Sequence, residues 1–309
     1  MTSPPLPTDL SSLHLLPLGE LMARALAVKL ERRGPSFSFC SILNAKSGRC
    51  SEDCRFCAQS SRYQTDAPVY PLRSKEEVVA AAHEAKRNGA SRFSLVTSGR
   101  GLSMAEVEQV AERIVAIRAE VGIAVCASLG ILDEAALRLL VQAGLSRYHH
   151  NLEASREYFP QVCTSHSFEE RLATIRAAHS AGLSVCSGGI LGLGETEEDR
   201  ISMAVTLAEC GVESVPLNIL IPLPGTPFAD HPPLPVGDIL KAIALYRLIL
   251  PHAAIRLAAG RESALAEFLS SAFLAGADGM MIGGYLTQRG RDPEVDLRFA
   301  SAMRTLWSM

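Results

Sequence analysis

Apolar residues in this chain follow two spacings, one typical of helices and one typical of strands. In residues 10–33 leucines recur at helical intervals, and Gly34 and Pro35 follow as a stop signal. From residue 37 onward, short apolar runs alternate with longer amphipathic segments up to the C-terminus. This alternation predicts strands that are each followed by a helix, which is the pattern of a parallel sheet covered by helices.

Eight of the short apolar runs predict strands. They are residues 37–43, 91–97, 123–128, 146–152, 183–189, 213–221, 253–257 and 279–282. The amphipathic segments predict helices at 74–88, 103–120, 133–143, 167–181, 195–210, 236–249, 262–275 and about 294–307. Two helix starts are marked by capping boxes, because Glu77 follows Ser74 and Glu106 follows Ser103 at the third position.

Eight strand–helix units predict an α/β fold, a (β/α)8 TIM-type barrel with an N-terminal and a C-terminal helix. We expect one domain over residues 1–309, with a helical extension at 1–34, the barrel at 35–290 and the last helix at 291–309. A three-quarter barrel of six units is the alternative. Both arrangements place the chemistry at the carboxyl ends of the strands.

The most informative stretch follows the first predicted strand. Cys50, Cys54 and Cys57 stand there at the spacing C-x3-C-x2-C. Three thiolates in one loop can bind three irons of an iron–sulfur cubane and leave the fourth iron open to another ligand. A zinc loop or chance clustering is the alternative, but structural zinc usually takes paired cysteine knuckles and the sequence has no second one.

Composition excludes several classes of function. The net charge is −3 without a basic run, which argues against a nucleic-acid partner. The apolar runs are too short for a membrane span, and residues 1–10 lack the features of a signal peptide. The eight cysteines therefore indicate metal and redox chemistry in the cytoplasm rather than a disulfide framework.

A second motif follows the fifth predicted strand. Gly188, Ile190, Gly192 and Glu195 read G-x-I-x-G-x-x-E, and together with the cysteine loop this resembles the radical S-adenosylmethionine (SAM) enzymes. The resemblance implies a [4Fe–4S] cluster on the loop and SAM bound beside the motif. Without the cysteines, the motif would also suit an ordinary strand-to-helix turn.

Further segments narrow the resemblance to the biotin synthases, from about residue 39 to residue 287. They are Ala58–Tyr63, Tyr148–Glu153, Val185–Gly189, Ser214–Asn218, Pro224–Pro227 and Arg256–Glu262. The resemblance implies that a 5′-deoxyadenosyl radical abstracts hydrogen from dethiobiotin and that a cluster sulfide captures the resulting carbon radical. A second SAM repeats this at the neighbouring position, which closes the ring of biotin. It also implies an electron donor such as flavodoxin or ferredoxin, and a homodimer.

The same resemblance implies roles for single residues. Asn151 and Asn218 would face the ureido ring, since an amide offers a donor and an acceptor. Glu153 would contact SAM or that ring, although the family usually has Asp or Asn there. His149 replaces a common Asn, and we interpret it as a structural histidine.

Biotin synthases hold a second cluster, commonly a [2Fe–2S] with three cysteines and one arginine. Cys126, Cys186 and Arg256 match three of these positions, but the fourth is Ser94, whose hydroxyl is a poor iron ligand. Cys40 and Cys163 are the candidate replacements. Four thiolates at Cys40, Cys126, Cys163 and Cys186 would suit a four-iron auxiliary cluster, which implies the family variant with such a cluster.

Two other functions fit part of the sequence. Another radical SAM enzyme would share the loop and the glycine motif, although a lipoyl synthase should carry a second tight cysteine motif near its N-terminus. A non-catalytic iron–sulfur scaffold has no need for Asn151, Asn218 or the glycine motif. SAM-dependent formation of 5′-deoxyadenosine separates the enzymes from the scaffold.

Overall fold

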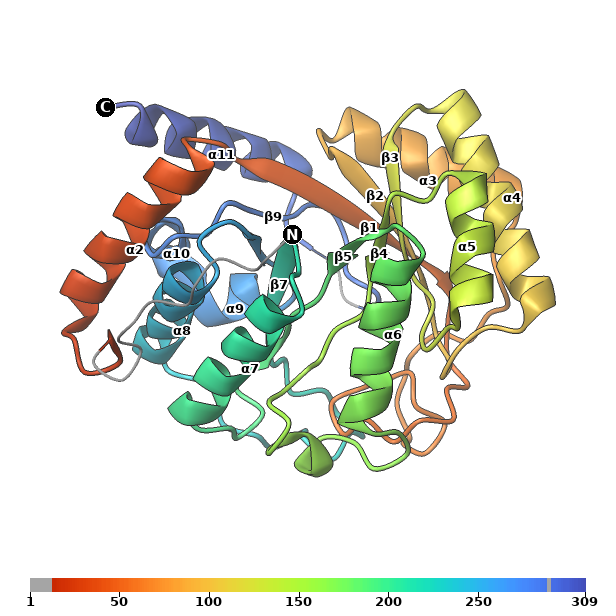
Figure 1. The fold of residues 1–309 in the computed structure, drawn as a ribbon, viewed down its shortest axis with the longest axis horizontal. Coiled ribbons are helices and arrows are strands. Elements are labelled where there is room, and N and C mark those ends of the chain that lie inside the picture. The colour runs from red at the N-terminus through yellow and green to blue at the C-terminus, as the bar shows by residue number, and fades with distance from the viewer. Residues whose placement is uncertain (1–12, 288–289) are drawn as a thin grey trace.

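The computed structural model describes residues 13–287 and 290–309 and shows a closed barrel of parallel strands (Figure 1). Strand β1 (Ser38–Lys46) pairs with β2 (Arg92–Thr97) on one side and with β9 (Gly279–Met281) on the other. The other strands are β3 (Ala124–Ser128), β4 (Arg147–His149), β5 (Ser184–Cys186), β6 (Gly189–Leu191), β7 (Ser214–Ile219) and β8 (Ala254–Leu257).

The strand order is β5-β4-β3-β2-β1-β9-β8-β7-β6, and a further pairing of β5 with β7 closes the ring. Strands β5 and β6 continue one another, so the ring has eight positions. The predicted (β/α)8 barrel is therefore confirmed, and the six-unit alternative is wrong, because β8 and β9 pair inside the ring with β7 and β1.

The helices surround the barrel in Figure 1. Those that follow strands are α3 (Lys75–Arg87), α4 (Met104–Glu120), α5 (Glu134–Ala143), α6 (Phe168–Ser180), α7 (Glu197–Glu209) and α8 (Val236–Ile249). The capping boxes predicted at Ser74 and Ser103 are both present. Each satisfies two backbone N–H groups that have no partner within the helix.

Three predicted elements differ in detail. The strand predicted at 183–189 is divided into β5 and β6, and β4 ends at His149 instead of continuing to residue 152. The helix predicted at 262–275 is broken into α9 (Arg261–Leu265), the 3-10 turn η2 (Ala266–Phe268) and α10 (Leu269–Leu274). Ala266 has a positive φ of 43°, which interrupts the helix without a glycine or proline to signal it.

Helices α2 (Leu18–Arg33) and α11 (Pro293–Trp307) lie away from the cysteine loop, at the amino end of β1 (Figure 1). The Phe37 ring stacks on that of Phe273 at 4.7 Å, and Trp307 joins the same aromatic cluster. Lys29 Nζ lies 3.3 Å from the centroid of the Trp307 ring. This aromatic cluster joins the start of β1 to helices α10 and α11. Residues 10–12 of the predicted first helix lie outside the described residues.

Among the described residues, no helix has both the length and the apolar character that a bilayer span requires.

Candidate active site

The three cysteines of the motif lie in the loop after β1. Backbone hydrogen bonds make the loop compact. The N–H of Cys50 donates to Gln59 O (3.1 Å), that of Ser61 to Cys50 O (2.7 Å) and that of Cys57 to Cys54 O (2.9 Å). All three cysteines are free and line the same cavity. The loop thus presents three thiols to one space, which fits a three-thiolate iron–sulfur site.

This outer cavity has a volume of about 360 Å³ and occupies the carboxyl end of the barrel. Its wall includes residues at the ends of β2, β3, β4, β6 and β7, such as Thr97, Ser128, Asn151, Ile190 and Asn218. The carboxyl ends of barrel strands are where side chains from distant parts of a chain converge on a ligand.

The glycine motif shapes the wall between β5 and α7. A Cβ on Gly188 would lie 2.0 Å from Pro216 O, so only glycine fits there. Glu195 is buried and its Oε1 accepts hydrogen bonds from Gly192 N (2.9 Å) and Arg200 Nε (2.7 Å). Glu195 therefore fixes the turn before α7, while Ile190 is the motif residue that lines the cavity.

The polar residues after β4 and on β7 line the same cavity. The amide of Asn151 accepts from Gly188 N (3.1 Å) and donates to Glu153 Oε2 (3.3 Å). Asn218 accepts from Ala259 N (3.2 Å) and donates to Gly189 O (3.3 Å). Each amide is thus oriented by one acceptor and one donor contact and keeps further hydrogen-bonding capacity.

Glu153 is held in an uncommon conformation beside these amides. Its φ is +70°, and it forms a bridge with Gly189, where a Cβ would lie 2.6 Å from Glu153 O. Burial raises the pKa of its carboxyl, and the guanidinium of Arg171 offsets only part of that effect. A half-buried carboxyl at the cavity wall is placed to receive a positively charged ligand group.

A second, inner cavity of about 40 Å³ lies among the strands. Cys40 on β1, Cys126 on β3 and Cys186 on β5 line it together with Ser94. These thiols come from alternate strands, as inward-facing side chains of one barrel layer do. Among the described residues, the buried hydroxyl of Ser94 has no hydrogen-bond partner, so a polar acceptor or donor is missing beside the thiols.

Three guanidinium groups also line the inner cavity. They belong to Arg92, Arg147 and Arg256. Burial raises the pKa of Cys126, and the charges of Arg92 and Arg147 act against it. Three thiols surrounded by three fixed positive charges fit an anionic iron–sulfur cluster better than they fit a bare cation.

His149 lies between the two cavities and lines both of them, with Ile42 and Met281. It is paired with Cys186 in the register of β4 and β5. Burial alone would raise the pKa of Cys186, but the charge and hydrogen bond of His149 lower it to about 7. The sequence predicts a structural histidine at this position, and its place in the walls of both cavities makes it a candidate site residue. Two otherwise apolar strands carry polar residues at alternate positions, Arg92 with Ser94 and Arg147 with His149. This alternation is the signal in the sequence that could have predicted the inner cavity.

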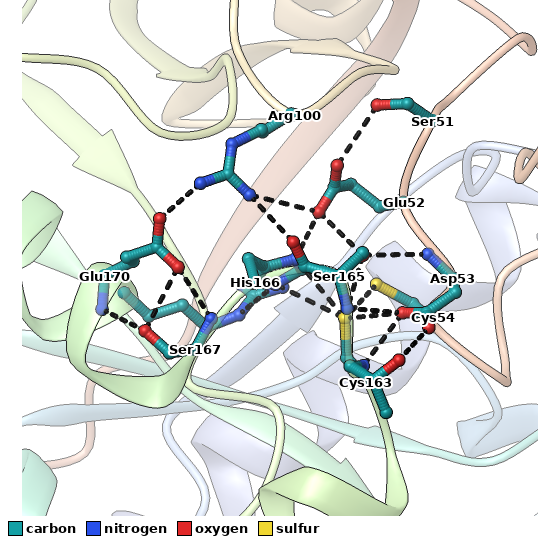
Figure 2. A network of polar contacts seen from close by, with 12 residues as sticks. Ser51, Glu52, Asp53, Cys54, Arg100, Cys163, Ser165, His166, Ser167 and Glu170 are labelled. Carbon is teal, nitrogen blue, oxygen red and sulfur yellow. Dashed lines mark hydrogen bonds and ion pairs between the residues drawn. The ribbon is translucent and has the colours of Figure 1, made fainter.

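Cys163 does not lie in the inner cavity. It is buried beside the cysteine loop, with its Sγ 3.7 Å from Cys54 Sγ (Figure 2). The Cys54 thiol donates to Cys163, and this bond is the main reason that the pKa of Cys163 is lowered to about 4. The geometry argues against the predicted place of Cys163 among the auxiliary ligands.

Comparisons with known proteins show the family of this chain. Residues 45–207 match the radical SAM superfamily, and residues 216–303 match the biotin and thiamin synthesis associated domain. The biotin synthase of Heliobacterium modesticaldum is 56% identical over 259 residues, which cover 84% of this chain and 79% of that protein. The chain belongs to the biotin synthase family.

A second biotin synthase and two solved structures are also similar to this chain. The biotin synthase of Pelotomaculum thermopropionicum is 50% identical over 93% of this chain and 89% of that protein. Among solved structures, methylornithine synthase (PylB) has a TM-score of 0.81 at 21% identity, covering 96% of this chain and 91% of that one. The hydrogenase maturase HydG from Carboxydothermus hydrogenoformans has a TM-score of 0.80 at 20% identity, covering 95% of this chain and 73% of that one. These two likenesses concern the barrel fold alone.

Proposed function

We propose that this biotin synthase family member converts dethiobiotin to biotin by radical SAM chemistry, with the sulfur supplied by an auxiliary cluster in the inner cavity. The observation that carries the proposal is that the two thiol-lined cavities share wall residues, among them His149. A substrate in the outer cavity would therefore have the cysteine loop on one side and the inner thiols on the other.

Cys50, Cys54 and Cys57 would hold the [4Fe–4S] cluster of the loop. Bound there with SAM, this cluster supplies the radical that takes hydrogen from an unactivated carbon. Among the protein residues, we propose that Ile190 and Glu153 in the cavity wall contact SAM. Gly188, Gly192 and Glu195 support them, because they fix the strand-to-helix turn that carries Ile190.

Asn151 and Asn218 are the proposed contacts of the ureido ring of dethiobiotin. Both amides line the outer cavity with their orientation set by backbone groups. A urea offers N–H donors and a carbonyl acceptor, which an oriented amide can meet without rearranging. The role of this chain is then to hold the substrate carbon between two cofactors and to exclude water.

The proposed auxiliary cluster is a four-iron cluster on Cys40, Cys126 and Cys186. Strands β1, β3 and β5 carry these thiols, so they approach the inner cavity from separate sides, as the corners of a cubane require. His149 is the proposed fourth ligand, since imidazole can replace thiolate on cluster iron. Arg256 is engaged instead with Ser214 Oγ and Ser38 O, each at 3.3 Å, and supplies a fixed charge.

The test is product analysis of the purified, anaerobically reconstituted and reduced protein. We expect SAM-dependent 5′-deoxyadenosine and biotin from dethiobiotin. In Cys40→Ala we expect 5′-deoxyadenosine without biotin, because the loop cluster is intact. If the wild type forms 5′-deoxyadenosine but no biotin from dethiobiotin, another radical SAM reaction is indicated. If it forms neither, the scaffold alternative is favoured.

A further inference from the structure

The outer side of the cysteine loop is open to solvent. Ser51 and Arg55 are exposed, and the proposed iron ligands Cys54 and Cys57 are half-buried. The thiols of the inner cavity on β3 and β5 are buried. The loop is therefore the part of the proposed two-cluster site that a second protein can approach directly.

Three arginines give this outer side a positive charge. Arg49, Arg55 and Arg62, the loop arginines, are all exposed. Between residues 49 and 66, a stretch that the structure describes throughout, Asp66 is the one exposed carboxylate. A guanidinium group stays charged at any pH at which proteins function, so the positive charge of this surface is permanent.

The two acidic residues of the motif do not offset this charge, because both are engaged on the protein side (Figure 2). Glu52 is buried, accepts from Ser165 Oγ (2.8 Å) and pairs with His166. Asp53 Oδ1 accepts from Thr164 N (2.9 Å) and Ser165 N (3.0 Å). Their carboxylates are thus bound to residues 163–170 and not to the loop arginines.

The loop arginines also lack partners of opposite charge. None of them forms an ion pair within the part of the chain that the structure describes. Arg100 and Arg156, which also lie on the carboxyl side of the barrel, pair with Glu170 and Glu169. The loop arginines therefore keep their full charge toward an approaching molecule.

Backbone carbonyls hold two of the loop arginines in place. Arg62 Nε donates to Ser51 O (2.9 Å), and Arg55 Nη1 donates to Gln161 O (3.3 Å). A guanidinium group has five N–H donors, so each keeps donors for a partner. The third, Arg49, directly precedes the first cysteine of the motif. All three cations therefore lie beside the proposed cluster.

We propose that the loop arginines form the docking surface for the one-electron carrier protein that reduces the loop cluster, and that this carrier presents carboxylates. The carrier loses one electron and the cluster on Cys50, Cys54 and Cys57 gains it, with no bond formed or broken. Complementary charges on two surfaces speed their encounter and fix their orientation. The proposal rests on the proposed function, because that reaction consumes electrons at the loop.

The experiment compares Arg49→Glu, Arg55→Glu and their double variant with the wild type, each as the reconstituted full chain. The probe is flavodoxin, a small acidic electron carrier. Its Kd is measured by calorimetric titration at low ionic strength. Formation of 5′-deoxyadenosine is then measured with reduced flavodoxin and, separately, with dithionite, which needs no docking surface.

We expect the double variant to bind flavodoxin more weakly and to lose about tenfold in the rate that limiting flavodoxin supports, since charge steering changes association rates by about 10- to 1,000-fold. The rate with dithionite should equal that of the wild type. Added salt should slow the flavodoxin-supported rate of the wild type more than that of the double variant. The control is Arg87→Glu, which reverses another exposed arginine, in the last turn of α3, and should behave as the wild type.

Three results would overturn the inference. They are flavodoxin binding and flavodoxin-supported rates in the double variant within twofold of the wild type, equal losses in Arg87→Glu, and a wild type that dithionite reduces but flavodoxin neither binds nor reduces. If a glutamate variant loses iron, Arg55→Gln and Arg49→Gln remove the charge without reversing it and take its place. Failure of the proposed function gives a different result, since the wild type would then form no 5′-deoxyadenosine with dithionite either.

Discussion

His149 and Cys186 lie opposite each other on the neighbouring strands β4 and β5, and both residues line the inner cavity. The imidazole also forms part of the wall that separates the outer from the inner cavity. One side chain therefore lines the cavity of the proposed auxiliary thiolates and also the space proposed for the substrate. His149 is therefore part of the wall that the two proposed sites share.

Replacing His149 with Ala should disrupt the auxiliary site and spare the loop cluster. We expect biotin formation to be lost while SAM-dependent 5′-deoxyadenosine formation persists, because Cys50, Cys54 and Cys57 are untouched. Labelling the histidines with ¹⁵N gives a direct readout, since a ligating imidazole produces hyperfine coupling to the cluster. If the auxiliary cluster is present but shows no histidine coupling, Arg256 becomes the better candidate for the fourth ligand.

Cys54→Ala should abolish SAM cleavage and leave the fold intact. A two-thiolate loop cannot hold the cluster, but Cys54 is only partly buried and its loss opens no large cavity. The measurement is 5′-deoxyadenosine formation, with circular dichroism to check folding. Cys210→Ala is the matched control, because Cys210 follows α7 and lines neither cavity. If Cys54→Ala cleaves SAM near the wild-type rate, the assignment of the cysteine loop to the [4Fe–4S] cluster is wrong.

Asn218→Leu should weaken dethiobiotin binding by about 1–3 kcal/mol, or roughly 5- to 150-fold, because the ureido group would be buried without a partner. Calorimetric titration of dethiobiotin into the SAM-bound protein measures this effect. The substitution also removes the bonds to Gly189 O and Ala259 N, so thermal unfolding is needed beside it. Binding within twofold of the wild type in a folded variant would show that Asn218 does not contact the ring.

The buried pair of Arg247 and Asp278 should contribute strongly to stability. Both side chains are at most 1% exposed, and Arg247 also donates to Gly276 O (2.9 Å) and Ala253 O (2.9 Å). Asp278→Ala leaves a buried charge without its partner and should lower the free energy of unfolding by about 3–5 kcal/mol. Chemical denaturation checks this, with Glu20→Ala, which breaks the exposed pair with Arg24, as the control. Equal losses in both variants would contradict the prediction.

Most of the fold could be predicted from the sequence because its signals are local. Apolar runs, capping boxes and terminal glycines mark eight strands and most helices, and a barrel follows from their number. The breaks that the sequence did not reveal depend on tertiary contacts. Arg261, at the start of α9, is fully buried and pairs with Asp296 of α11 at 2.7 Å, a contact across 35 residues that no local pattern shows.

The candidate site was predictable to a similar degree. Cys40, Cys126 and Cys186 lie on regular strands, where side-chain direction follows from parity, and they share one cavity. Cys163 lies in an irregular loop, where no period tells which way a side chain points. Its position depends on the bonds from Thr164 and Ser165 to Asp53, more than 100 residues earlier. Resemblance to the family gave no position for it either.

The most direct test of the two-cluster account is the iron content of the anaerobically reconstituted protein, measured with its Mössbauer spectrum in the wild type and in Cys40→Ala. We predict about eight irons per chain in the wild type, all in four-iron clusters, and about four in Cys40→Ala. About six irons with a two-iron signal would contradict the four-iron auxiliary site. Equal iron in both proteins would contradict the assignment of Cys40 and of the inner cavity.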